Sequence, residues 1–134
     1  APDGRVSVAV PDVHTHELFL DANDNLYGEH LWYEGDATKK WGHRVWRLKP
    51  DGTMSDVIPA REGFLTGYSF QRDRAGNMYW ADRGKATVIK RRSPDGKIVT
   101  HVTADFRAVG WMTALPDGTL FLIDAGDLRR VSPD

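Results

Sequence analysis

The chain has 134 residues, of which 40% are hydrophobic and 28% are charged, a composition typical of one ordinary globular domain. Its net charge of −1 gives no field that would attract nucleic acid or an anionic membrane, and no apolar stretch approaches the ~18 residues of a spanning helix. The absence of cysteine excludes disulfides and thiolate zinc sites. We therefore expect neither nucleic acid nor a membrane as partner.

Apolar and polar residues alternate along the chain with a period of two, which predicts β-strands and no helix. Short turns rich in Gly, Asp and Asn separate the strands, so we expect antiparallel hairpins. In chain order the predicted strands cover residues 5–10, 17–21, 25–30, 44–49, 53–58, 68–72, 77–82, 87–92, 97–103, 111–115, 119–124 and 127–132.

One six-residue pattern occurs three times, at residues 25–30, 77–82 and 119–124. Each copy follows a turn and precedes an apolar-basic run that ends in Pro-Asp. The first copy departs from the pattern, because its turn has no glycine and a long insertion, residues 31–43, precedes the basic run. The period of roughly 40–50 residues is typical of propeller blades, which bury their apolar faces only by stacking.

Aligned apolar positions show how the repeats would stack. One set contains Leu26, Met78 and Leu120, and the next position along contains Tyr27, Tyr79 and Phe121. Successive strand residues point to opposite faces, so we expect one of the two sets to face the layer between blades.

The two ends of the chain complement each other. Residues 127–132 are a third strand without a fourth, and residues 5–10 are a fourth strand without a third. We therefore expect residues 1–134 to be one all-β propeller segment of four-stranded antiparallel blades, three per chain, with one blade split between the termini. Propellers need roughly four to eight blades, so either a homodimer completes a six-bladed ring or the chain is a piece of a longer protein.

Residues 73–82, which read Asp-Arg-Ala-Gly-Asn-Met-Tyr-Trp-Ala-Asp, are followed by Val-Ile-Lys-Arg at 88–91 and Ser-Pro-Asp-Gly-Lys at 93–97. This pattern resembles the NHL repeat and the blades of the gluconolactonase/strictosidine-synthase-like superfamily. The resemblance covers essentially the whole chain and implies a six-bladed propeller. The superfamily includes calcium-dependent lactonases, scaffolds without enzymatic activity, and modules that bind protein or RNA.

Polar residues recur where the first strand of each blade begins and its second strand ends. Antiparallel neighbours bring these ends to one rim, and the first strand of a blade lines the central channel. We therefore expect a ligand-binding site at the channel mouth. Its predicted residues are His16, Glu29, His30, Tyr68, Asp82, Arg83, Trp111 and Asp124.

Two hypotheses for the function follow from this mouth. One is a propeller that binds a small molecule or a protein there; the other is a metal-dependent hydrolase of lactones or esters. A divalent metal ion would be held by His14, His16, Glu29 and His30, a set that suits zinc or iron better than calcium, because imidazole is a poor calcium ligand. Alternatively, Asp82 and Asp124 cap the turns that follow them by accepting backbone N–H bonds.

Overall fold

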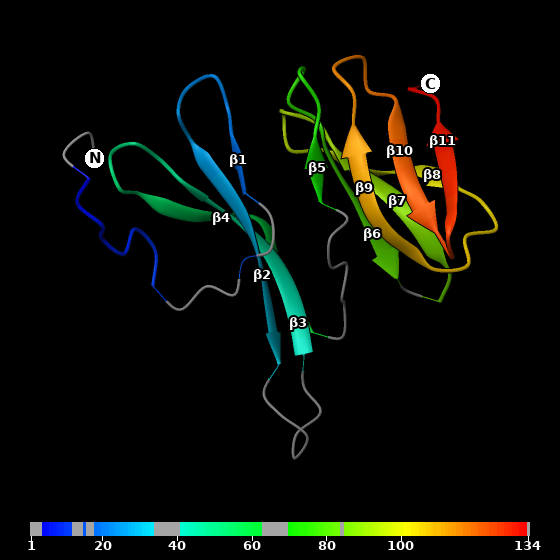
Figure 1. The fold of residues 1–134 in the computed structure, drawn as a ribbon, viewed down its shortest axis with the longest axis horizontal. Coiled ribbons are helices and arrows are strands. Elements are labelled where there is room, and N and C mark those ends of the chain that lie inside the picture. Colours follow the sequence, from blue (N-terminus) through cyan, green and yellow to red (C-terminus); the bar gives the residue numbers. More distant parts are fainter. Residues whose placement is uncertain are drawn as a thin grey trace.

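A computed structural model describes residues 4–11, 15, 18–33, 41–62, 70–83 and 85–133. The described residues form three antiparallel sheets of four, four and three strands (Figure 1). They contain no helix, and hence none long and apolar enough to cross a membrane. The predicted all-β class and antiparallel hairpins are confirmed.

Within each sheet, consecutive strands of the chain lie side by side. The first sheet contains β1 (Leu18–Leu20), β2 (Leu26–Tyr33), β3 (Trp41–Leu48) and β4 (Met54–Glu62). The second contains β5 (Gln71–Arg72), β6 (Met78–Arg83), β7 (Thr87–Arg92) and β8 (Ile98–Thr103). The third contains β9 (Val109–Ala114), β10 (Leu120–Asp124) and β11 (Asp127–Val131), and so has no fourth strand among the described residues.

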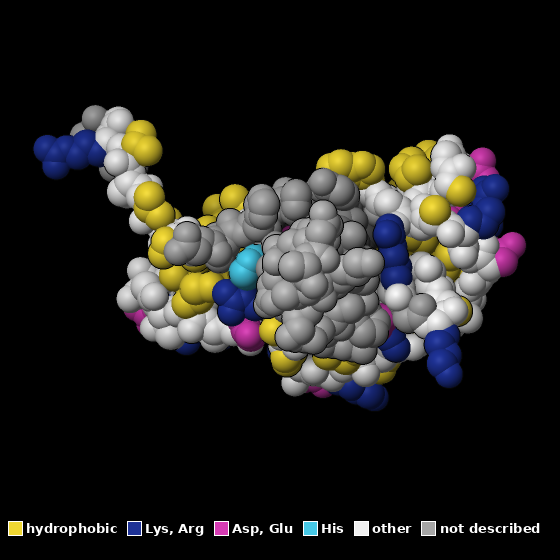
Figure 2. Space-filling view, turned by 90° about the horizontal axis from the view of Figure 1, so that it is seen from below, with side chains coloured by type: hydrophobic (Ala, Val, Ile, Leu, Met, Phe, Trp, Pro, Cys, Tyr) yellow, Lys and Arg dark blue, Asp and Glu magenta, His cyan; other side chains and the backbone are white. Residues whose placement is uncertain are grey.

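Two sequence predictions differ from the structure. Residues 5–10 form no strand; they project from the body of the molecule, with Val6 98% exposed (Figures 1 and 2). A β-strand forms only where a neighbouring strand offers free backbone hydrogen bonds. The free edge of β11 belongs to the third sheet, whereas residues 5–10 lie at the end of the molecule occupied by the first sheet, so within one chain they cannot pair. The predicted insertion at 31–43 begins and ends as strand, because Leu31 pairs with His43 and Tyr33 with Trp41.

Five hairpin turns share one hydrogen-bond pattern, in which a residue's N–H donates to the carbonyl four positions later. The fourth residue of each turn has a positive φ, and four of them are glycines. In the first repeat Asp24 takes this place with φ of 58°. Asp tolerates the left-handed region better than most side chains, which explains why this turn has no glycine.

A hydrogen-bonded network ties the turns of the first two repeats to their strands. Asp73 accepts bonds from the backbone N–H and side-chain amide of Asn77 and from the Tyr79 hydroxyl, at 2.8 to 2.9 Å. Asp21 is bonded in the same way to Asn25 and Tyr27. Because the phenols come from the second strand of each hairpin, the network fixes the turn against the sheet.

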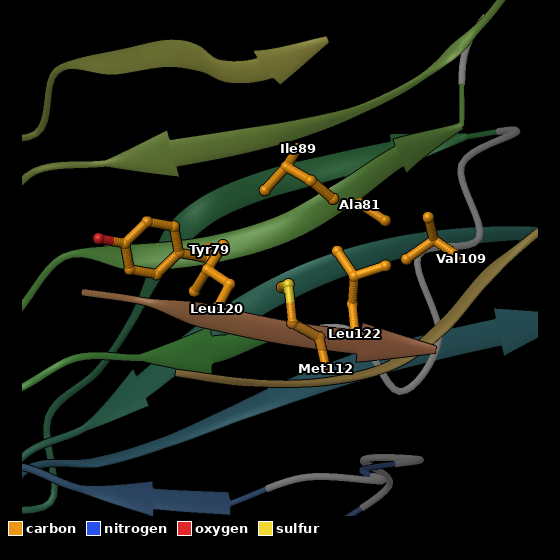
Figure 3. Close-up of a cluster of buried hydrophobic side chains, with 7 residues drawn as sticks. All are labelled: Tyr79, Ala81, Ile89, Val109, Met112, Leu120 and Leu122. Carbon is orange, nitrogen blue, oxygen red and sulfur yellow. The ribbon is translucent and has the colours of Figure 1, made fainter. Parts of the chain in front are cut away.

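The second sheet is packed on both faces. On β6, Met78 and Trp80 pack with Tyr27, Val45 and Ile58 of the first sheet. The alternate residues of β6 face the third sheet instead, and the cluster that they form contains Tyr79, Ala81, Ile89, Val109, Met112, Leu120 and Leu122 (Figure 3). In the middle repeat both aligned sets therefore face an inter-sheet layer, Met78 toward the first sheet and Tyr79 toward the third.

The two outermost sheet faces are apolar and partly exposed. On the first sheet, Leu18 and Leu20 are 60% and 67% exposed. On the third sheet, Trp111 and Leu128 are 58% and 68% exposed, beside Phe121 and Ile123. These faces lie at opposite ends of the row of three sheets (Figure 1).

Candidate functional site

The candidate site lies beside the ends of β6 and β10 and the middle of the longer strand β2, and all three strands run toward the same side, which we call the mouth end (Figure 1). Figure 2 views the molecule from the mouth end. Three predicted site residues, His14, His16 and Tyr68, lie outside the described residues. The other predicted residues occupy two positions between sheets and a third on the two outer faces.

A buried carboxylate–imidazole pair occupies the first position. The Oε2 atom of Glu29 on β2 lies 3.1 Å from Nε2 of His43 on β3, and the two side chains are 0% and 4% exposed. In the register Glu29 faces Val45, so His43 is its diagonal neighbour on the same sheet face. That face also carries Tyr27 and Val45, and it packs on the second sheet.

His43 was not among the predicted site residues, because it was assigned to the insertion. The alternation of His43, Val45 and Arg47 along one strand could have placed it on the face of Glu29. A sequence pattern cannot show that β3 begins as early as Trp41, since that depends on pairing with the end of β2.

Asp82 lies across the layer from this pair. Asp82 is 8% exposed. It is an alternate residue of β6 with Met78 and Trp80, which pack on the first sheet. Alternation therefore directs Asp82 toward the layer that holds Glu29 and His43. This layer thus has two acidic side chains and one imidazole near its mouth end, contributed by two sheets.

The second position contains Arg83 and Asp124, between the second and third sheets. The Arg83 guanidinium donates to the carbonyl of Val109, which links the end of β6 to the start of β9. Asp124 is 0% exposed, and its Oδ1 accepts the backbone N–H groups of Arg107 and Ala108 at 2.9 and 2.7 Å.

Asp124 also pairs with Arg129, whose Nε lies 3.2 Å from Oδ2. Burial raises the pKa of Asp124, but the bonds from Ala108 and Arg107 and the Arg129 charge outweigh it, so the pKa falls below its usual value. The predicted alternative was a cap on the turn after β10. The observed bonds instead come from Arg107 and Ala108, the two residues just before β9. Asp124 therefore holds this segment against the end of β10.

The third position is formed by the outer faces. His30 alternates along β2 with Gly28 and Leu26, so its side chain lies on the outer face of the first sheet, as theirs do. Trp111 lies on the outer face of the third sheet with Phe121 and Leu128. Within one chain these two predicted site residues therefore lie at opposite ends of the row of sheets.

The described residues contain no group of three or more His, Cys, Asp or Glu side chains placed to hold a metal ion. Glu29 and His43 supply one oxygen and one nitrogen donor. Of the predicted metal ligands, Glu29 and His30 lie on opposite faces of β2, by alternation along the strand. The described arrangement joins one carboxylate and one imidazole by a single buried hydrogen bond.

Comparison of the chain with protein-family models, with curated proteins and with solved structures gives no match.

Proposed function

We propose that two copies of this chain form a six-bladed, NHL-like propeller that binds a small molecule or a protein at the mouth of its central channel. Each copy would contribute three blades. The four-stranded sheets with consecutive strand order and the two inter-sheet apolar layers support this proposal.

Equivalent positions in the three repeats support the ring. Leu120 and its strand neighbours Ala114 and Val131 face the second sheet, and all three belong to or pack on the same apolar cluster. The first sheet has Leu20, Leu26 and Leu48 at these positions, on its outer face. A third sheet from a second copy would cover that face as the second sheet covers the third.

The position of the N-terminal segment agrees with this arrangement. It projects from the end of the molecule where the first sheet lies (Figure 1). In a closed ring, that is the side on which the partner's third sheet would lie. Among the described residues β11 pairs with β10 alone, so its other edge could accept residues 5–10 of the second copy.

The buried Glu29–His43 pair is the observation that carries the binding site. A carboxylate that is 0% exposed is costly unless it is hydrogen-bonded, and the pair lies at the mouth end where the predicted channel opens. In the ring, His30 would share a layer with Trp111 of the partner subunit. The three layers of each half-ring would then all present polar or aromatic side chains at one end.

We propose binding in preference to the hydrolase, because the described residues supply only the Glu29 and His43 donors in one place. Titration with zinc separates the two hypotheses. Stoichiometric zinc binding that is lost in His43→Gln would favour the hydrolase, whereas the binding function requires no metal.

The proposal is tested by light scattering and by a thermal-shift screen with sugar acids and their lactones as probes. We expect a dimer, and at least one probe that stabilises the native chain but not Glu29→Gln. His101→Gln is the matched control, because His101 lies on β8 against Tyr79, away from the Glu29–His43 pair. A monomer at every concentration, or no probe whose effect depends on Glu29, would contradict the proposal.

A further inference from the structure

A polar cleft lies between the first and second sheets, at the end of the molecule that carries the hairpin turns. This turn end is opposite the mouth end. The cleft has a volume of about 320 Å³ and is lined by residues of both sheets. Those that bear on its chemistry are Asp21, Tyr27, Arg47, Asp56, Arg72 and Arg92.

Three arginines from three strands meet in this cleft. Arg47 comes from β3, Arg72 from β5 and Arg92 from β7. Their hydrogen bonds within the described residues are long and go to neutral oxygens, from Arg47 to Ser55 and from Arg92 to the Ser93 carbonyl, both at 3.4 Å. Arg72 lies over the Tyr27 ring at 5.9 Å.

Two carboxylates, Asp21 and Asp56, also line the cleft, but among the described residues neither forms an ion pair with these three arginines. The oxygens of Asp21 accept four bonds, from the N–H groups of Asn23 and Asn25, the Asn25 amide and the Tyr27 hydroxyl. Asp56 pairs with Arg44 at 3.2 Å. The Nε atoms of Arg47 and Arg72 are buried without a hydrogen-bond partner, and so are those of Arg44 and Arg91, which do not line the cleft.

The other repeats show that two of these arginines are not needed for stacking. The register places Arg72 and Arg92 beside Met78, as it places Ala114 and Val131 beside Leu120 in the third repeat. Ala114 and Val131 pack on an apolar cluster. The second repeat thus has two cations at the positions where the third repeat has apolar side chains. Such a departure from the repeat indicates a functional position.

We propose that this cleft binds a phosphate group. Guanidinium groups bind phosphate oxygens with paired, charge-assisted hydrogen bonds, and the three arginines outnumber the carboxylates Asp21 and Asp56 that line the same cleft. A cleft of this size takes a phosphate together with a small attached group. The site uses residues of one chain only and is independent of the ring and of the mouth.

The experiment is calorimetric titration with inorganic phosphate and, separately, with glucose 6-phosphate. Wild type is compared with the double variant Arg72→Ala/Arg92→Val, which introduces the residue types of the third repeat. We expect affinity to fall at least about tenfold in the variant, since it loses two charge-assisted contacts to the phosphate. Tighter binding of glucose 6-phosphate would identify the phosphoryl group of a metabolite as the ligand, and equal or weaker binding would identify free phosphate.

Arg74→Ala/Lys85→Ala is the control, because it removes the same charge from two exposed positions that do not line the cleft. It should bind phosphate as wild type does. The proposal is overturned if neither probe binds at millimolar concentration, if the double variant binds unchanged, or if the control loses affinity equally. Circular dichroism checks that the double variant keeps its β-sheet spectrum.

Discussion

The carboxylate–amide–phenol networks show how single residues define the repeat. Asp73, Asn77 and Tyr79 form one network, and the first repeat has the same three residue types at the aligned positions. In the third repeat all three are replaced together, by Leu115, Thr119 and Phe121. A buried carboxylate without its donors is costly, so loss of one member favours loss of the others.

Tyr79→Phe should lower the free energy of unfolding by about 1–3 kcal/mol, because the buried Asp73 loses a donor. The triple variant Asp73→Leu/Asn77→Thr/Tyr79→Phe, which copies the third repeat, should cost less than the sum of the three single changes. Urea denaturation measures each value. Strictly additive losses would show that the three residues do not act as a unit.

Acid should weaken the fold through Asp21. Burial raises its pKa, but the bonds from Asn25, Asn23 and Tyr27 outweigh this and lower the pKa from 3.8 to about 2. The ionised carboxylate therefore stabilises the folded state above pH 3.8, and this contribution is lost as pH falls toward about 2. Asp21→Asn should reduce the pH dependence of unfolding in that window. Asp105→Asn, at a carboxylate that is 93% exposed, is the comparison, and an equal reduction there would contradict the assignment.

Gly28 is required by a neighbouring ring. A Cβ at this position would lie 2.3 Å from the buried indole of Trp46, which covers Gly28 on the outer face of the first sheet. Gly28→Ala should destabilise the protein by about 1–3 kcal/mol, as overpacking does. Gly110→Ala, where a Cβ meets no atom within 4 Å, should cost clearly less in the same thermal melts. Equal losses would mean that the backbone, not the ring, requires glycine.

At the scale of elements, burial depends on a strand's place in the row of sheets. β6 is covered on both faces, and five of its six residues are buried. β10, the equivalent strand of the third sheet, has three buried residues of five, and they alternate along the strand. The same repeat pattern therefore gives a core strand in one blade and a half-covered strand in another, and only a neighbouring sheet makes the difference.

Residues 1–10 are expected to act between copies. Their deletion should weaken the dimer, because the β11 edge would lose the strand that pairs with it. Sedimentation at several concentrations measures the dissociation constant. A deletion variant that associates as tightly as the full chain would show that these residues do not complete the third sheet.

At the scale of the whole molecule, the two exposed apolar faces should control assembly. Leu128→Asp places a charge on the outer face of the third sheet, so we expect a monomer in light scattering. Ile98→Asp is the matched control: Ile98 is 46% exposed, but it lies on β8, away from both end faces, and this variant should remain a dimer. The prediction fails if the two variants associate equally.

The sequence by itself predicted the strand order and the repeat. Alternation and turn chemistry are local properties, so β7 coincides with its predicted range, 87–92, and the aligned second strands begin within one residue of their prediction. Among the described residues the third sheet has no fourth strand after β11, as the pattern at 127–132 indicates, and its completion by residues 5–10 stays a prediction. These features require only neighbours in sequence.

Tertiary structure decided which side chains meet. Glu29 and His43 are 14 residues apart and come together only because β2 and β3 pair beyond their predicted ends. The predicted mouth residues Glu29 and His30 separate because adjacent strand residues point to opposite faces, and the face that is buried depends on the next sheet. The Arg47, Arg72 and Arg92 cleft was not predicted for the same reason: its three strands belong to two sheets, and only their stacking brings the cations together.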